Sequence, residues 1–270
     1  MTIPITDTAL IARREQILNK LIEKKPKFLA LSDWDGTITD RDSNDCLTDE
    51  LANMYQERRE WNRQTVSGEK TFKETFDLML KGVAKGYSFS ECKDFLVKHI
   101  KLDSGFLDFY KYCKSQDIPL VIVSSGMDTL IRGVLTALDT ENVTSELEII
   151  SNGVEEHDGT WNIKWIDPEG KYGHDKSRAI LPFRELGDER PTLIFFGDGV
   201  SDMSAAQHAD VLFVKIKSDG EHDLQDYCQN EGISHILFDN FSAAQKVVAS
   251  MVEQGKSPEE VLQTYNGKSC

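Results

Sequence analysis

The chain has 270 residues, of which 39% are hydrophobic and 29% charged, as in an ordinary folded protein. Its 31 basic and 46 acidic residues give a formal net charge of -15, which argues against non-specific binding to nucleic acid, because such binding requires a basic surface. This length accommodates one large domain, or a core domain with a second domain inserted into it.

The five cysteines include no CxxC pair, and their odd number predicts free thiols in a reducing compartment. No apolar stretch is long enough to cross a bilayer. The segment from Met1 to Lys20 lacks the basic start and the apolar core of a secretory signal. We therefore expect a cytoplasmic protein whose partners include neither a membrane nor a nucleic acid.

The first part of the chain predicts a helix, a strand and then a long helical segment. Apolar residues at helical spacing predict a helix from Ile11 to Glu23, and the apolar run from Phe28 to Ser32 predicts a buried strand. From about residue 44 to 114 there is no proline, and apolar residues recur every three or four positions. We expect residues 41–114 to form a helical domain that is inserted into a core domain of residues 1–40 and 115–270.

The remainder of the chain alternates predicted strands with predicted helices. Strands are predicted over 119–123, 147–151, 192–196, 211–216 and 233–238, and helices over 128–138 and 176–186. The dipeptide Asp158-Gly159 is typical of tight turns and predicts a small β-hairpin flap. The alternation predicts an α/β fold with a doubly wound parallel sheet, into which the helical segment is inserted after the first strand.

Polar side chains follow several of these predicted strands. The carboxyl ends of parallel strands lie along one edge of a sheet, where α/β proteins bind their ligands. The candidate residues at this edge are Asp33 and Asp35 after the first strand, Ser124 after the second, Lys176 at the start of a helix, and Asp198 and Asp202 after a later strand.

A site that gathers several carboxylates is expected to hold a cation or a proton. Two such charges about 4 Å apart repel each other by about 4 kcal/mol at an effective dielectric constant of roughly 20. Mg²⁺ suits the site, because it prefers oxygen ligands and keeps water and substrate phosphate in its coordination shell. Together with Lys176, it would offset the repulsion between a carboxylate nucleophile and a phosphate group.

Four motifs together resemble those of the haloacid dehalogenase (HAD) superfamily of phosphohydrolases. They are Asp33-Trp34-Asp35-Gly36-Thr37, Val123-Ser124-Ser125-Gly126, Lys176 and Gly197-Asp198-Gly199-Val200-Ser201-Asp202, in matching order and spacing. The resemblance extends from Phe28 onward and implies a Rossmann-like core with the first type of cap. Within the superfamily the chain is most similar to the phosphoserine-phosphatase branch, and especially to fungal sugar-alcohol (polyol) phosphatases.

The resemblance implies a Mg²⁺-dependent phosphatase that works through an aspartyl-phosphate intermediate. It implies that Asp33 is the nucleophile and a metal ligand. Asp35 is implied to protonate the leaving alkoxide, to deprotonate the hydrolytic water and to offer its backbone carbonyl to the metal. Asp198 is implied to be a direct ligand, and Asp202 to bind through water or to orient the coordination shell.

The resemblance also implies how the phosphoryl group is held. The Ser124 hydroxyl and the Ser125 amide are implied to bind phosphoryl oxygens, and Lys176 to neutralise their charge. Lys171 is a nearby alternative for this lysine. His174 is expected to be structural rather than catalytic.

Two positions of the predicted cap bear on the substrate. Phosphoserine phosphatases carry a glutamate that binds the substrate amine and an arginine that binds the substrate carboxylate, and these positions correspond to Asp42 and Asp77 here. An aspartate at position 77 would repel a substrate carboxylate but accept hydrogen bonds from hydroxyl groups. We therefore expect Asp42 and Asp77 to bind substrate, and we favour a polyol phosphate over phosphoserine.

Several alternatives remain open at this point. A small phosphate ester is the expected partner, and phosphoserine, pyridoxal phosphate and methylthio-ketopentenyl phosphate are alternative substrates. A dehalogenase is disfavoured, because Asp35 supplies an acid that phosphate ester cleavage needs and dehalogenation does not. A catalytically idle binding or regulatory protein is the alternative of another class. The sequence is compatible with a monomer or a dimer.

Overall fold

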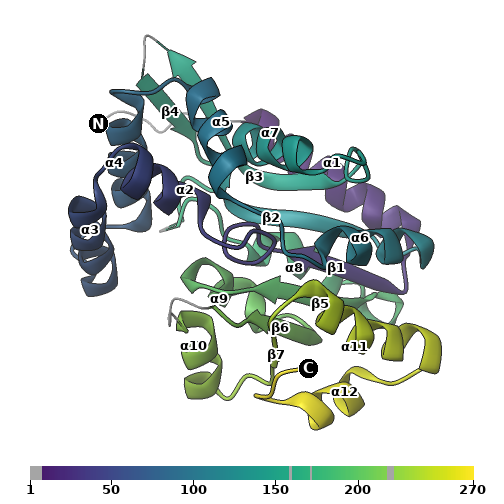
Figure 1. Ribbon diagram of the computed structural model, residues 1–270. Coiled ribbons are helices and arrows are strands. Elements are labelled where there is room, and N and C mark those ends of the chain that lie inside the picture. The colour runs from purple at the N-terminus through teal and green to yellow at the C-terminus, as the bar shows by residue number, and fades with distance from the viewer. Residues whose placement is uncertain (1–7, 158–159, 171, 218–221) are drawn as a thin grey trace.

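The computed structural model describes residues 8–157, 160–170, 172–217 and 222–270. Its strands form one sheet with helices on both faces (Figure 1). In spatial order they are β4 (Thr160–Lys164), β3 (Glu148–His157), β2 (Leu120–Met127), β1 (Phe28–Ser32), β5 (Thr192–Gly197), β6 (Val211–Lys215) and β7 (Ile236–Phe238). All neighbours pair in parallel except β3 and β4. The predicted doubly wound parallel sheet is confirmed.

Alternate residues of the central strands face two separate helical layers. In β1, Leu29 and Leu31 face one layer, and Ala30 faces the other. The first layer contains α1 (Thr8–Lys24), α8 (Ser177–Arg184), α9 (Met203–Ala206) and α10 (Asp223–Glu231), and the second contains α6 (Phe106–Ser115), α7 (Asp128–Leu138), α11 (Phe241–Gln254) and α12 (Pro258–Tyr265). Because both faces are covered, the central strands are largely apolar.

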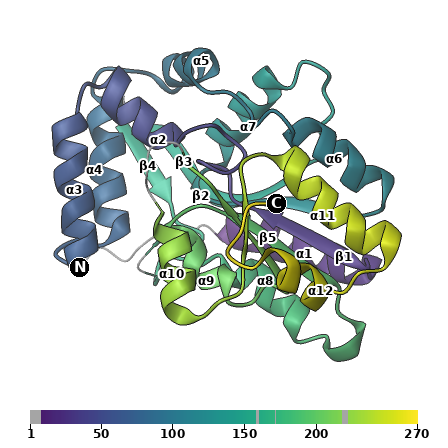
Figure 2. The ribbon, with the colours of Figure 1, turned by 60° about the horizontal axis from the view of Figure 1, so that its bottom comes forward.

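Between β1 and α6 the chain forms a group of helices, which stands to one side of the sheet (Figure 2). They are α2 (Ser43–Cys46), a π-helical turn (Leu47–Leu51), α3 (Tyr55–Ser67), α4 (Phe72–Ala84) and α5 (Phe89–His99). The helical insertion after the first strand is therefore confirmed. Helix α6, which also falls in the predicted cap segment, packs against α11, with the rings of Phe106 and Phe241 5.4 Å apart. The division of residues between cap and core stays a prediction.

The predicted hairpin is continuous with the core sheet, because both share β3. The first part of β3 pairs in parallel with β2, and its second part pairs antiparallel with β4, from Gly153 opposite Lys164 to His157 opposite Thr160. The expected turn at Asp158-Gly159 lies outside the described residues. The described part of the hairpin thus extends the sheet.

Three predicted strand boundaries were wrong. The second strand continues past residue 123 to Met127, so that it contains the serine motif. The third strand, predicted over 147–151, continues to His157. The last strand begins at Ile236 rather than at 233, because Gly232 ends α10 with φ +69° and the Ile233 amide donates to the Cys228 carbonyl at 2.8 Å. The five cysteines are free thiols, as predicted. Within the described ranges, no helix is long and apolar enough to cross a membrane.

Candidate active site

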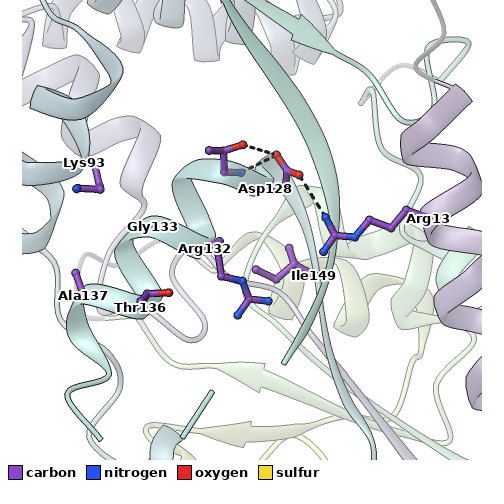
Figure 3. Close-up of a pocket in the computed structure, with 9 residues that line it drawn as sticks. Arg13, Lys93, Asp128, Arg132, Gly133, Thr136, Ala137 and Ile149 are labelled. Atoms are coloured by element: carbon purple, nitrogen blue, oxygen red, sulfur yellow. Dashed lines mark hydrogen bonds and ion pairs between the residues drawn. The ribbon is translucent and has the colours of Figure 1, made fainter. Parts of the chain in front are cut away.

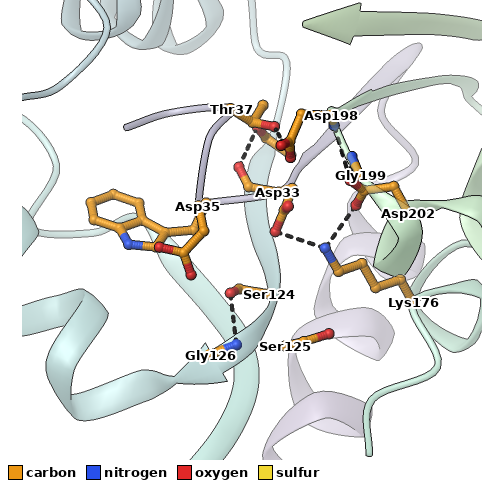
Figure 4. A network of polar contacts seen from close by, with 12 residues as sticks. Asp33, Asp35, Thr37, Ser124, Ser125, Gly126, Lys176, Asp198, Gly199 and Asp202 are labelled. Atoms are coloured by element: carbon orange, nitrogen blue, oxygen red, sulfur yellow. Dashed lines mark hydrogen bonds and ion pairs between the residues drawn. The ribbon is translucent and has the colours of Figure 1, made fainter. Parts of the chain in front are cut away.

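The predicted site residues outside the cap segment meet at the carboxyl edge of the sheet (Figure 4). Asp33 follows β1, Asp198 follows β5, and Ser124 and Ser125 lie in β2. Lys176 is the residue that precedes α8. Because β2, β1 and β5 are adjacent and parallel, their carboxyl ends bring these side chains together as the sequence predicts.

Three carboxylates form the centre of the site. Asp33, Asp198 and Asp202 each offer an oxygen within 4.8 Å of the others, and all three side chains are buried. Asp202 lies in the short 3-10 helix Val200–Asp202 after β5. One of its oxygens, Oδ2, accepts the backbone amides of Asp198 and Gly199 at 3.0 and 3.1 Å. The turn after β5 is therefore folded around the carboxylate of Asp202.

Lys176 supplies the main positive charge of this cluster. Its side chain is 0% exposed, and its Nζ lies 2.7 Å from Oδ1 of Asp33 and 2.7 Å from Oδ1 of Asp202. Burial alone would lower the pKa of Lys176, but the charges of Asp202 and Asp33 outweigh it and raise that pKa. Lys176 therefore stays charged where it bridges two elements of the site. The alternative Lys171 lies outside the described residues.

Two side chains contact the Asp198 carboxylate, and a glycine lies directly against it. It accepts a hydrogen bond from Thr37 Oγ1 at 3.2 Å, and Lys217 Nζ lies 3.2 Å from its Oδ2. Gly36 has φ +72°, and a Cβ there would lie 2.5 Å from the same Oδ2. Only glycine allows this approach, so the motif after β1 keeps a glycine next to the acidic cluster.

The cluster fits a hard divalent cation. Burial and the neighbouring charge of Asp202 raise the pKa of Asp33 well above its usual range and that of Asp198 to about 6. A cation would remove this cost. Six oxygens about 2.1 Å from Mg²⁺ lie about 3 to 4.2 Å apart, which the spacing within 4.8 Å accommodates.

Asp35 lies beside the cluster but in a different environment. Its Oδ1 accepts the backbone amide of Ser43 at 2.8 Å, and its Oδ2 accepts from Asn44 Nδ2 at 3.1 Å. Both donors belong to α2, the first helix after β1. Burial and the nearby charge of Asp42 raise the pKa of Asp35 to about 8. A carboxyl group that keeps its proton near neutral pH is suited to act as a general acid.

The serine motif lies opposite these carboxylates. Ser124 Oγ accepts the amide of Gly126 at 3.0 Å. The hydroxyl of Ser125 is buried and has no hydrogen-bond partner in the described part of the chain. His174 is fully buried, and its Nδ1 lies 2.7 Å from the carbonyl oxygen of Ser124, so it supports the strand end as a structural residue would.

The two predicted substrate-binding acids have different surroundings. Asp42 is the N-cap of α2, where Oδ1 accepts the amides of Asn44 and Asp45 at 2.8 and 2.9 Å, and it lies close enough to influence Asp35. Asp77 lies on α4 and pairs with Lys81 at 2.6 Å. Substrate contact by either residue stays a prediction.

Three contributors to the site had no assigned role in the sequence. Thr37 lies inside the first motif that matched the family, so its side chain carried a signal that was not used. Asn44 contacts Asp35 from the helix that follows this motif. Lys217 follows β6, and a single lysine after a strand gives no such signal. Its contact with Asp198 depends on β5 and β6 being neighbours in the sheet.

A separate cavity of about 580 Å³ lies between α1, α5 and α7 (Figure 3). Arg13, Lys93, Asp128 and Arg132 line it, and no predicted site residue does so. Arg13 and Asp128 face each other across it at 3.6 Å. Because it contains none of the clustered carboxylates, the chemistry belongs to the sheet edge rather than to this cavity.

This fold and this acidic cluster define a HAD-type hydrolase. The family model for haloacid dehalogenase-like hydrolases matches residues 30–207, and the chain belongs to that family. It is 40% identical over 225 residues to Pdp3-interacting factor 1 of Schizosaccharomyces pombe, covering 83% of this chain and 95% of that protein. It is 36% identical over 246 residues to the polyol phosphate phosphatase PYP1 of Saccharomyces cerevisiae, covering 84% and 99%.

Solved structures agree on the fold. A phosphoserine phosphatase from T. onnurineus has a TM-score of 0.56 and 16% identity, covering 83% of this chain and 95% of that one. A phospho-aspartyl intermediate analogue of phosphoserine phosphatase has a TM-score of 0.53 and 16% identity, covering 76% and 99%. At this identity the likeness concerns the fold alone.

Proposed function

We propose that the protein hydrolyses the phosphate monoester of a small polyol with the aid of Mg²⁺, through an aspartyl-phosphate at Asp33. The observation that carries this proposal is the buried group of three carboxylates, two of which are bridged by Lys176, at the carboxyl edge of the sheet. As a HAD-family member with phosphatase relatives, the chain is a phosphoric monoester hydrolase.

In the first step, a carboxylate oxygen of Asp33 attacks phosphorus, and the bond from phosphorus to the ester oxygen breaks. The leaving alkoxide takes the proton of Asp35, whose carboxyl group Ser43 and Asn44 hold in place. Lys176, 2.7 Å from Asp33, offsets the negative charge that the nucleophile and the phosphoryl group bring together.

The second step releases phosphate and restores the enzyme. The Asp35 carboxylate takes a proton from a water molecule, whose oxygen attacks phosphorus, and the bond from phosphorus to Asp33 breaks. The Ser124 hydroxyl and the Ser125 amide bind the phosphoryl oxygens in both steps. Splitting the reaction in this way replaces one difficult displacement by two easier ones.

Asp33, Asp198 and Asp202 would hold the Mg²⁺ ion, with the backbone carbonyl of Asp35 as a further ligand. When bound, the ion supplies positive charge against the repulsion between a carboxylate and a phosphate dianion. Both oxygens of Asp202 already accept hydrogen bonds, from Lys176 and from backbone amides. Asp202 is therefore suited to binding through water or to orienting the other ligands.

The substrate proposal has support from the relatives and from the cap. The polyol phosphate phosphatase is 36% identical, whereas a 2-hydroxy-3-keto-5-methylthiopentenyl-1-phosphate phosphatase of Bacillus velezensis is 27% identical. We further propose that residues 41–114 act as a cap, in which Asp42 and Asp77 accept hydrogen bonds from substrate hydroxyls. The five free thiols suit a reducing cytoplasm.

The nucleophile is tested with Asp33→Asn. We expect turnover to fall below detection, because the amide cannot form the ester. The free energy of unfolding should not fall, because one of three mutually repelling carboxylates is neutralised. Asp188→Asn, at an exposed position, is the matched control and should keep wild-type activity. Wild-type turnover by the Asp33 variant would rule out this mechanism.

The substrate class is tested with a panel of phosphate monoesters in the presence of Mg²⁺. The panel contains ribitol and sorbitol phosphates, phosphoserine, pyridoxal phosphate and a methylthio-ketopentenyl phosphate. We expect the highest kcat/KM for a polyol phosphate. Faster hydrolysis of phosphoserine would refute the assignment based on Asp77, and no hydrolysis of any ester would favour a binding or regulatory protein.

A further inference from the structure

The segment that precedes Lys176 is held by a buried ion pair between its Asp167 and Arg14 of α1. Asp167 is 2% exposed, and its backbone amide donates to the Gly173 carbonyl at 3.0 Å. Gly173 has φ +71° and lies against the ring of Trp165, where a Cβ would come within 2.1 Å of the ring. The segment therefore turns back on itself just before Lys176.

The Asp167 carboxylate joins this turn to two helices. Arg14 of α1 donates through Nη1 to Oδ1 and Oδ2 at 2.9 and 3.0 Å. The backbone amide of Asp175, the residue before Lys176, donates to Oδ2 at 3.0 Å. Arg178 Nη1 lies 3.0 Å from Oδ1. One carboxylate thus fixes the backbone on the N-terminal side of Lys176.

Stability alone does not account for burying this pair. Arg14 is 7% exposed, and its helix α1 precedes the residues that the family model matches. Removing two charges from water costs several kcal/mol per ion, and apolar residues of similar volume often stabilise a fold equally well. What an apolar pair could not do is accept the amide of Asp175.

We propose that Arg14 and Asp167 are positioning residues for Lys176, and this inference rests on the proposed phosphatase function. Lys176 must place one flexible side chain 2.7 Å from both Asp33 and Asp202. The position of the Lys176 backbone determines where that side chain begins. A displacement of about 1 Å in an active site can lower the rate by about 100-fold.

The test compares kcat and KM of Arg14→Met, Arg14→Lys and Asp167→Asn with those of the wild type. We expect Arg14→Met to lower kcat by about 10- to 100-fold and to change KM less, because the serine motif, which also binds the phosphoryl group, is untouched. Arg14→Lys, which keeps the charge, should recover part of kcat. Asp167→Asn, which leaves two arginines without their carboxylate, should resemble Arg14→Met.

Arg132→Met is the matched control. Arg132 is also a partly buried arginine, and it donates to the carbonyls of Thr144, at 3.1 Å, and Leu147, away from Lys176. This variant should lose stability yet keep kcat. Equal kcat in Arg14→Met and Arg132→Met, below the melting temperatures of both, would overturn the proposal. If Arg14→Met does not fold, the kcat values of Arg14→Lys and Asp167→Asn are compared with that of Arg132→Met instead. Equal values would again overturn the proposal.

Reductive methylation with formaldehyde gives a readout that does not depend on turnover. Lys176 is 0% exposed in the native protein and should resist labelling, as detected by mass spectrometry of its peptide. Arg14→Met should make Lys176 reactive, whereas Arg132→Met should not. Continued protection of Lys176 in Arg14→Met would contradict a positioning role. A wild-type protein that hydrolyses no ester would instead refute the proposed function, with the labelling result unaffected.

Discussion

The buried charges of the site are balanced only in part by protein side chains. Asp33, Asp198 and Asp202 lie together, and Lys176 and Lys217 bring positive charge to them. Burial and mutual repulsion accordingly raise the pKa values of Asp33 and Asp198. Such residue-level costs are typical of functional sites, which depart from what stability alone would select.

His174 predicts a loss of stability in acid. Burial lowers its pKa to about 4 in the folded protein, against about 6.5 in the unfolded chain. Between these values the unfolded state binds the proton and the folded state does not, so the free energy of unfolding falls as pH falls. From pH 7.5 to 5.0 we expect this residue to cost about 2 kcal/mol, measured by urea unfolding.

The comparison that isolates this effect uses His174→Gln. This variant should lose less stability than the wild type over the same pH range. His222→Gln, at an exposed position, should follow the wild type. An identical pH dependence in His174→Gln and the wild type would show that the buried imidazole does not control the acid response.

Individual site residues were predictable where they lie in contiguous motifs at strand ends. Asp33, Asp198 and Asp202 were found in this way and Lys176 at the start of a helix, and the structure brings them together. The contact of Lys217 was not predictable, because it depends on which strands are neighbours in the sheet. The same holds for Arg14, whose partner Asp167 is 153 positions away in the chain.

Among the helices and strands, the buried strands were the ones best predicted from the sequence. β1, β5 and β6 are short apolar runs covered on both faces, so burial and sequence pattern agree. The ends of β2 and β7 were misjudged for local reasons. β2 continues through polar serines that face the site. The predicted first residue of β7, Ile233, instead donates its amide to the Cys228 carbonyl at the end of α10.

Helix α4 depends on a capping box at its first turn. Thr71 Oγ1 accepts the Glu74 amide at 3.3 Å, and Glu74 Oε2 accepts the Thr71 amide at 2.8 Å. Thr71→Ala should lower the free energy of unfolding by about 1 kcal/mol. Amide hydrogen exchange should quicken in the first turn of α4 and stay slow in β1 and β5. Ser90→Ala, exposed in the first turn of α5 and not one of the two residues that bond in its capping box, is the control. Unchanged exchange in α4 would contradict this role.

At the scale of the whole molecule, the acidic cluster links metal binding to folding. A cation that binds only the folded state stabilises it by about 2.7 kcal/mol at a concentration of about 100 times Kd. We expect Mg²⁺ to raise the melting temperature by several degrees, measured against Na⁺ at equal ionic strength. Asp198→Asn should abolish most of this rise, while its melting temperature in EDTA should equal or exceed that of the wild type.

A control variant separates specific Mg²⁺ binding at the cluster from a general effect of charge on stability. The chain has a formal net charge of -15, so any cation could stabilise it weakly. Asp188→Asn changes the same net charge at an exposed position and should keep the full response to Mg²⁺. An equal Mg²⁺ response in Asp198→Asn and Asp188→Asn would argue against a metal site at the cluster.

Two aromatic pairs join the hairpin region to the helices beside it. Phe76 of α4 packs against Trp165 at 5.9 Å, and Phe89 at the start of α5 packs against Trp161 of β4 at 5.4 Å. Such aromatic pairs contribute about 0.5–1.5 kcal/mol each, so breaking both costs about 1–3 kcal/mol. That energy multiplies the ratio of closed to open molecules by about 5 to 150. If these helices form a lid, substrate enters through a minor conformer whose population the two tryptophans determine.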